Sequence, residues 1–233
     1  MDPTPERFRR LARSAPYRWR SLLLEGSWGP HVTQSPAFAV DNRMSDGIRL
    51  RVERPDRIRV ETRDGVVLQE LRQGGLGSGA VLTSDGRSVP RVPPPPPVPE
   101  LDEDGLVVSG RQPWNDGPDV PMWQDYRFVA ALDPYELSDG VDVLELATVA
   151  HGGRPAWEAL LRPTAGYEPR CSCCPLMRTR ETDLMEGLEP RPGYAEAHRV
   201  RLDVGTGVCV SAREIGGPGD GTGHDLVLVE VDP

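Results

Sequence analysis

The sequence predicts a mainly β protein (α+β), built as a curved antiparallel meander or half-barrel with an N-terminal helix and short internal helices. Residues 45–71 read as three strands that fold back on one another, and further strand pairs separated by glycine turns follow. No strand–helix–strand alternation argues for a parallel sheet. We expect a single domain over residues 1–233, with a Pro/Gly-rich loop or insertion at 89–121.

The central meander shows the period-2 alternation of half-buried strands. Apolar residues at 48, 50 and 52 alternate with charged ones, and the alternation resumes at 58 and 60 after the break at RPD (54–56). The turn sets the register and brings opposite charges together on the polar face. Asp64-Gly65 makes the next tight turn, into a third strand at 66–71. The expected cross-strand pairs are Ile48–Thr62, Arg49–Glu61, Leu50–Val60, Val52–Ile58 and Glu53–Arg57.

The N-terminal residues predict a short helix followed by strands. Thr4 can cap the helix with Pro5 at its first position, apolar residues at 8, 11, 12 and 15 form one stripe, and Pro16 ends it. Residues 17–28 then alternate as a strand, and a weaker strand is expected at 37–44.

The middle of the chain is rich in glycine and proline. GGLGSG (74–79) lacks the third glycine and the surrounding βαβ unit of a phosphate cradle, so a flexible loop is expected there. A short strand could form at 80–83. The segment VPRVPPPPPVPE (89–100) predicts polyproline II or a disordered loop, either a stiff spacer or an SH3-type ligand with R-x-x-P-x-x-P spacing.

The second half returns to regular structure. Asp133 with Pro134 and Glu136 resembles a capping box and predicts one or two helical turns. Hairpins are expected for 141–150 with 154–162, and for 197–204 with 208–213, where Leu202 would face Val210. Residues 179–192 read as irregular, and a terminal strand is expected at 226–231.

Composition excludes several classes of function. All 27 basic residues are arginine, so a lysine nucleophile, a Schiff base and a phosphate-loop lysine are excluded. The net charge of −9 argues against nonspecific nucleic-acid binding. No apolar run approaches the roughly 20 residues of a transmembrane segment. The opening MDPTPERFRR shows no signal peptide, so we expect a cytoplasmic protein, whose reducing surroundings disfavour stable disulfides.

The four cysteines are the one metal-like constellation in the sequence. Four thiolates suffice for a tetrahedral zinc site, in which no coordination position stays open, so a metal here would be structural. His198 or His151 could substitute as a ligand. The alternative is a set of reduced thiols, buried or serving redox chemistry. The candidate zinc ligands are Cys171, Cys173, Cys174 and Cys209.

The order of elements resembles the bacterial carriers of the LolA, LppX and RseB type. The resemblance rests on RPDRIRVE (54–61) with the following Asp64-Gly65, and on LDVGTGV (202–208). It covers roughly residues 4–71 and 126–231. It implies an incomplete, strongly curved β-barrel whose concave face is closed by helices and holds acyl chains or similar apolar groups.

That resemblance suggests a set of ligand-binding residues on the concave face, although the same side chains could simply fill the core. The candidates are Trp19, Trp28, Leu50, Val52, Ile58, Val60 and Trp157.

The preferred hypothesis is a non-enzymatic, carrier-like protein that binds an apolar small molecule or lipid in its curved sheet. The alternatives are a protein-interaction or regulatory module with a protein partner, and a protein with a structural zinc or thiol site at the cysteine cluster. No nucleophile elbow, metalloprotease helix or dinucleotide fingerprint occurs in the sequence. An enzyme is therefore the less favoured class.

Overall fold

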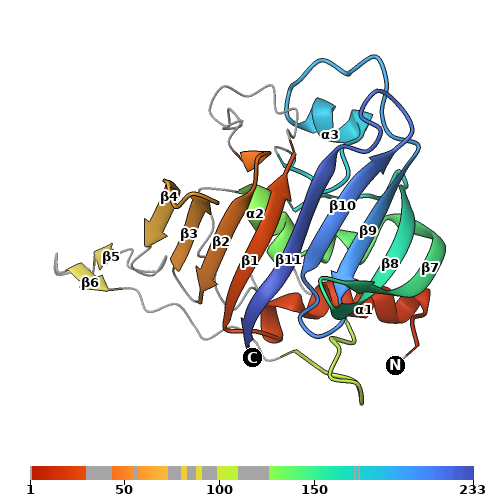
Figure 1. Ribbon diagram of the computed structural model, residues 1–233. Helices are drawn as coiled ribbons and strands as arrows, with labels where there is room; N and C mark the ends of the chain where they lie inside the picture. The colour runs from red at the N-terminus through yellow and green to blue at the C-terminus, as the bar shows by residue number, and fades with distance from the viewer. Residues whose placement is uncertain are drawn as a thin grey trace.

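The computed structural model of the chain describes residues 2–29, 44–54, 57–72, 80–82, 88–90, 99–109, 126–170, 172 and 174–233. Nine strands form one open antiparallel sheet in the order β4-β3-β2-β1-β11-β10-β9-β8-β7 (Figure 1). A separate hairpin pairs β5, Ala80–Leu82, with β6, Ser88–Pro90. The protein is mainly β, as the sequence predicts. The strands of the large sheet are β1 Ser21–Trp28, β2 Ile48–Glu53, β3 Arg57–Thr62, β4 Val67–Arg72, β7 Val141–His151, β8 Arg154–Pro163, β9 Ala197–Asp203, β10 Cys209–Ile215 and β11 Gly223–Asp232.

The sheet consists of two meanders joined by the first and last strands of the chain. Strands β1–β4 follow one another in space, as do β7–β11, and β1 pairs antiparallel with β11. At this joint a Cβ atom on Gly26 would lie 2.0 Å from the Asp225 carbonyl oxygen. The two backbones can approach this closely because position 26 has no side chain.

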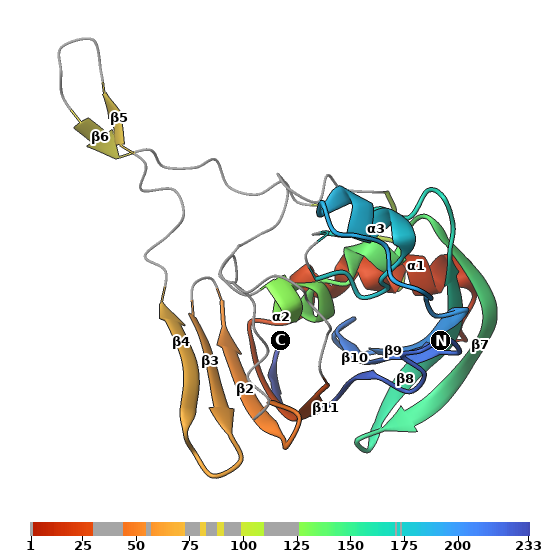
Figure 2. The same ribbon diagram turned by 90° about the horizontal axis from the view of Figure 1, so that it is seen from above.

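Helices cover the concave face of the sheet (Figure 2). In α1, Pro5–Ser14, the Thr4 hydroxyl accepts a hydrogen bond from the Arg7 N–H, which confirms the predicted cap. Helix α2 spans Tyr126–Leu132, a 3₁₀ turn follows at Tyr135–Leu137, and α3 spans Arg180–Met185. The buried face of α1 and the inner faces of the strands share one hydrophobic core.

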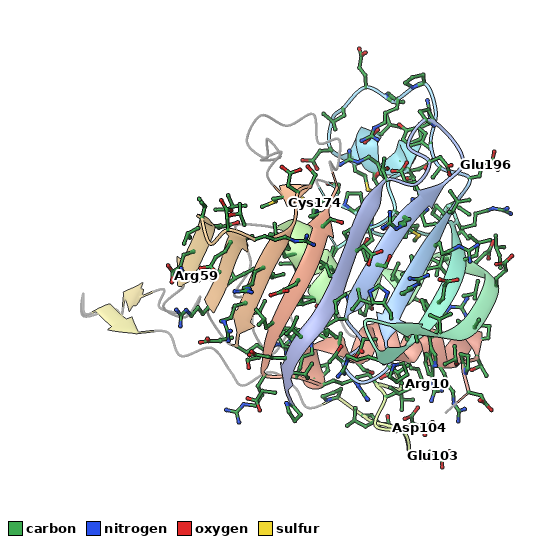
Figure 3. All side chains as sticks on the ribbon, viewed as in Figure 1. Arg10, Arg59, Glu103, Asp104, Cys174 and Glu196 are labelled. Atoms are coloured by element: carbon green, nitrogen blue, oxygen red, sulfur yellow. The ribbon has the colours of Figure 1, made fainter. Side chains whose placement is uncertain are left out.

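Side chains of α1 also hold the segment 99–109 against the end of the sheet. Arg10 forms an ion pair of 3.0 Å with Asp102, and Arg7 forms one of 3.1 Å with Asp104. Figure 3 labels Arg10 of α1 and Asp104 of this segment at the same end of the molecule. The Val107 N–H donates a buried hydrogen bond of 2.8 Å to the Ser14 hydroxyl. This segment therefore packs as an ordered part of the fold.

The predicted register of the central meander is confirmed. All five expected pairs of β2 with β3, from Ile48–Thr62 to Glu53–Arg57, are the pairs observed. The inner residues of these strands are fully buried, and the outer ones carry charge. Alternation and turn length together determined this register because a shift by one residue would have exposed the apolar set.

Several sequence expectations differ from the structure. Strand β1 begins at Ser21 rather than at 17, because residues 15–17 form a 3₁₀ turn. Leu202 pairs with Cys209 rather than Val210, because the register shifts between Cys209 and Ser211. Asp133 does not cap the 3₁₀ turn and instead pairs with Arg170. Helix α3 lies in the segment expected to be irregular.

Some predictions lie outside the described residues. These are residues 37–43 of the strand expected at 37–44, the glycine-rich loop at 74–79, and residues 91–98 and 110–121 of the Pro/Gly-rich segment expected at 89–121. Within the described helices, none is long and apolar enough to cross a bilayer.

Candidate functional site

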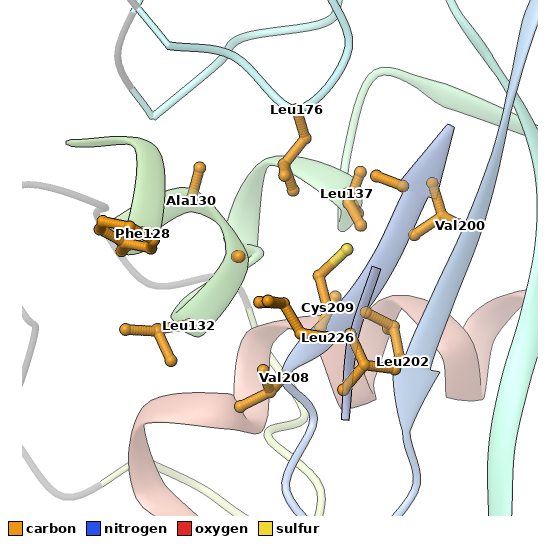
Figure 4. Packing of buried hydrophobic residues seen from close by; sticks show 14 of the residues in the cluster. Phe128, Ala130, Leu132, Leu137, Leu176, Val200, Leu202, Val208, Cys209 and Leu226 are labelled. Carbon is orange, nitrogen blue, oxygen red and sulfur yellow. The ribbon is translucent and has the colours of Figure 1, made fainter. Parts of the chain in front are cut away.

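A buried carboxylate fixes the segment that follows β8 above the inner face of the sheet. Glu136 accepts hydrogen bonds from the Tyr167 hydroxyl (2.5 Å) and from the backbone N–H groups of Arg170 (2.9 Å) and Leu176 (2.6 Å). Burial raises the pKa of Glu136, while these donors act against the rise. The Leu176 side chain consequently points into the core near Leu137 (Figure 4).

A second buried carboxylate, Asp183 of α3, gathers the polar groups beside this segment. Asp183 is 1% exposed and accepts from Arg178 (2.5 Å) and from the Tyr194 hydroxyl (2.8 Å). The Arg191 Nε atom lies 3.6 Å from the Oδ2 atom of Asp183. One carboxylate thus holds two guanidinium groups at the end of the sheet.

A pocket of about 140 Å³ opens where these arginines meet the ends of β9 and β10. Apolar groups of Pro175, Leu176 and Ala212 form part of its wall. The turn between β10 and β11 closes another side. The polar lining residues are Arg178, Arg191, His198, Arg213, Glu214 and Thr222. We refer to this hollow as the His198 pocket.

His198 is the unusual member of this set. It lies on the inner face of β9 with Val200 and Leu202, and it is 1% exposed. Neither ring nitrogen has a hydrogen-bond partner among the described residues. Burial lowers the pKa of His198 to about 4, so its imidazole is neutral at pH 7. A neutral imidazole offers one N–H donor and one acceptor nitrogen.

Glu214 lies directly opposite His198 in the β9–β10 register. Burial is the largest influence on Glu214 and raises its pKa, while Arg191 and Arg178 lower it. A Cβ atom on Gly219 would lie 2.0 Å from the Glu214 Oε2 atom. The Glu214 carboxyl group therefore lies at the edge of the His198 pocket, in the space that a side chain at position 219 would need.

A larger and shallower hollow of about 340 Å³ lies on the other side of Arg178. It is lined by the end of β8 and the start of α3, including Thr164, Arg180, Glu181 and Tyr194. Arg178 lines both hollows. Among the described residues that line the larger hollow, no buried polar side chain lacks a hydrogen-bond partner as His198 does.

The apolar ligand-binding candidates all lie in the core. Trp19 is 3% exposed, and the other six are fully buried in the same hydrophobic cluster. Trp28 packs on Phe128 of α2 at 4.9 Å and stacks on His224 at 4.4 Å. Their role in binding stays a prediction.

The cysteines divide between described and undescribed positions. Cys171 and Cys173 lie outside the described residues. Cys174 and Cys209 are buried and form no disulfide. Burial raises the pKa of the Cys209 thiol, whose side chain lies in the core, and this favours the protonated form. Over the described part of the chain, no three His, Cys, Asp or Glu side chains converge as metal ligands would. The zinc site stays a prediction.

Sequence reasoning considered His198 as a substitute metal ligand and, more weakly, as the base of a cysteine–histidine pair, but not as part of a binding pocket. The signal for its burial is present in AHRVRLD (197–203), where His198 takes the place of an apolar residue in an alternating strand. The neighbours that make it a site come from four other segments, and nothing local in the sequence relates them.

No protein-family model, curated protein or solved structure matches this chain. The functional argument therefore rests on the geometry of the pocket.

Proposed function

We propose that this protein is a non-enzymatic binding protein for a small polar molecule, which occupies the His198 pocket. The observation that carries the proposal is the buried imidazole of His198, which lines a hollow and has no hydrogen-bond partner in the described structure. Leaving such a group unsatisfied costs about 1–3 kcal/mol, and a ligand that pairs with it recovers that free energy.

The pocket size limits the ligand. Its volume of about 140 Å³ is close to that of an engineered cavity of about 150 Å³ that holds benzene, so about six non-hydrogen atoms fit. Unlike that apolar cavity, the His198 pocket has polar groups as well as apolar ones in its wall. A compact molecule with hydrogen-bonding groups is the matching class.

Binding accounts for the polar groups of the pocket better than catalysis does. A histidine base is usually oriented by a hydrogen bond to a third group, and His198 has none in the described residues. The one hydroxyl among the described lining residues, Thr222 Oγ1, donates to the Gly219 carbonyl at 2.6 Å. It is held within its own turn rather than against the imidazole.

An apolar ligand in the curved sheet is a second candidate. The open, curved sheet with helices on its concave side supports it. Native mass spectrometry of the purified protein tests it directly. A bound lipid would add several hundred daltons, lost on denaturation, and a mass equal to the bare chain would count against this candidate.

The main proposal can be tested by an NMR titration with a set of small polar compounds, both neutral and charged. Binding should shift the resonances of His198, Glu214 and Thr222 together. Ala212→Leu places a larger side chain in the pocket wall and should abolish these shifts. Ala147→Leu on the exposed face of β7 is the matched control and should leave them unchanged. If no compound moves these three resonances, the proposed function is wrong.

A further inference from the structure

Strand β7 is one end of the nine-stranded sheet, and among the described residues β8 is its one partner strand. It runs over 11 residues and lies at the outer end of the sheet in Figure 2. Ala147, Thr148 and Ala150 are exposed. An edge strand of this kind presents a row of backbone N–H and C=O groups with which another strand can pair.

The pairing of β7 with β8 identifies the residues whose backbone groups face the open edge. Ala150 lies opposite Pro155, which has no N–H, and the Pro155 carbonyl accepts from the Val204 N–H on the far side of β8. Ala150 therefore directs its own N–H and C=O away from β8. Because the two kinds of pair alternate along antiparallel strands, Thr148 and Leu146 do the same. Within the part of the chain that the structure describes, no other backbone group bonds to these three residues.

The sequence of this edge lacks the features by which edge strands resist pairing. Residues 146–150 (LATVA) contain no charge and no proline, and the register shift of β7 lies before them, between Val143 and Glu145. The edge strand at the other end of the sheet differs, since β4 carries Glu70, which forms an ion pair of 3.0 Å with Arg59. Charges, prolines and bulges are the usual protections of an exposed edge. Of the two sheet edges, β7 is therefore the better template for pairing.

We propose that two copies of this chain associate through β7, with the two strands antiparallel and Thr148 on the twofold axis. In this register Leu146 pairs with Ala150 of the partner subunit, and Thr148 pairs with Thr148 of the partner subunit. All three residues with open backbone groups are then used, and each hydrogen-bonded pair contributes two bonds, about six in total. Any other antiparallel register of the same two edges uses fewer of them. The interface does not involve the His198 pocket.

Charge and symmetry favour a second copy as the occupant of this edge. The register places the acidic Glu145 opposite the partner's His151, and the residues between them carry no charge. Two threonines meet at the axis, and a cross-strand threonine pair stabilises an antiparallel sheet. Because an isologous contact uses the same patch twice, the open residues of one copy match those of the other. The contact is a single pair of strands, so the expected dimer is weak and depends on concentration.

Sedimentation velocity of the full chain, from about 1 μM to about 500 μM, tests the association. Wild type should pass from monomer to dimer within this range. A chain that stays monomeric throughout overturns the proposal. Species that grow beyond the dimer also overturn it, because a head-to-tail contact of β7 with β4 would produce them and a twofold contact would not.

Amide hydrogen exchange, followed residue by residue by NMR, locates the interface in wild type. In dilute protein the amides of Leu146, Thr148 and Ala150 should exchange freely, whereas those of Ala147 and Val149, which face β8, should be protected. At a concentration where half of the chains are dimeric, exchange of the first three should slow about twofold, the factor by which their open form is depleted. Dimerisation that leaves these three amides unchanged would place the contact elsewhere and overturn the proposal.

A substitution at the axis tests the same edge. Thr148→Pro removes an N–H that takes no part in the pairing with β8, so the urea midpoint should change little while dimerisation weakens at least about tenfold. Thr148→Val keeps the N–H and is the matched control, which should dimerise as wild type does. Equal dimerisation of the two variants would overturn the proposal. The exchange measurement uses wild type alone, so it decides the question even where proline disturbs folding.

Discussion

Two buried histidines should make the fold sensitive to mild acid. His198 and His224 are at most 1% exposed, and burial lowers the pKa of each to about 4. The Nε2 atom of His224 lies 2.9 Å from the Cys209 carbonyl oxygen, and its ring stacks on Trp28. Its other ring nitrogen has no hydrogen-bond partner in the described structure. Among the described residues, no carboxylate accepts a hydrogen bond from either imidazole ring.

The sign and size of the effect follow from proton linkage. An unfolded histidine titrates near pH 6.5, so between pH 6.5 and about 4 the unfolded chain binds more protons than the folded one. The stabilisation is therefore complete above pH 6.5 and is lost as the pH falls towards 4. At 1.36 kcal/mol per pH unit the loss approaches about 3 kcal/mol for each histidine. Two such losses together would consume much of the 5–15 kcal/mol typical of a domain.

Urea unfolding at pH 7.5, 6 and 5, followed by tryptophan fluorescence, measures this dependence. Wild type should lose about 2 kcal/mol per histidine between pH 7.5 and pH 5. His198→Gln and His224→Gln should each remove about half of the total loss of stability seen in wild type between these two pH values. The double variant should remove most of it. Glu136, whose raised pKa acts with the opposite sign, is common to all four proteins and cancels in the comparison. The reasoning is refuted if the double variant shows the same pH dependence as wild type.

The remaining predictions concern buried polar groups, backbone space and metal. Glu136→Ala leaves three hydrogen-bond donors without their acceptor and should lower the free energy of unfolding, measured in urea, by about 3–6 kcal/mol. Glu136→Gln keeps one carbonyl oxygen as an acceptor and should cost less. Equal losses of stability in the two variants would contradict this. Gly223→Ala places a Cβ atom 1.8 Å from the Ala212 carbonyl oxygen. It should lower the free energy of unfolding more than Gly153→Ala does, because position 153 has open space around it. Gly153→Ala should cost only the strain of a positive φ, about 1–2 kcal/mol. If the cysteines hold zinc, elemental analysis of the purified protein should find one zinc per chain, and chelation should expose all four thiols to alkylation. If the protein treated with chelator unfolds at the same urea midpoint as the protein as purified, the zinc hypothesis is wrong.

Local pattern was sufficient for the strands that alternate and turn sharply. The β2–β3 register follows from period-2 burial and turn length, and the β7–β8 hairpin follows from the glycine pair at 152–153. The α1 helix was predictable because Thr4, Pro5 and a single apolar stripe lie within one short segment. In each case the residues that decide the structure are neighbours in the sequence.

The sequence was less informative where two structural signals compete. The segment 179–192 is polar and reads as irregular, yet Thr179 and Thr182 form a reciprocal cap that starts α3. Asp133 has the sequence context of a helix cap, but Arg170, 37 residues later, takes its carboxylate. A distant ion pair thus overrode the local preference.

The sequence by itself determined the β class, the N-terminal helix and the pairing of strands adjacent in the chain. The tertiary structure decided that β1 pairs with β11, which joins two meanders into one sheet. It also decided the candidate site, since His198 meets Arg178, Arg191 and Glu214 only after separate segments pack at the ends of β9 and β10. Alternation and capping are read from neighbouring residues, whereas the pairing of chain ends and the convergence of polar groups depend on how the whole core is buried.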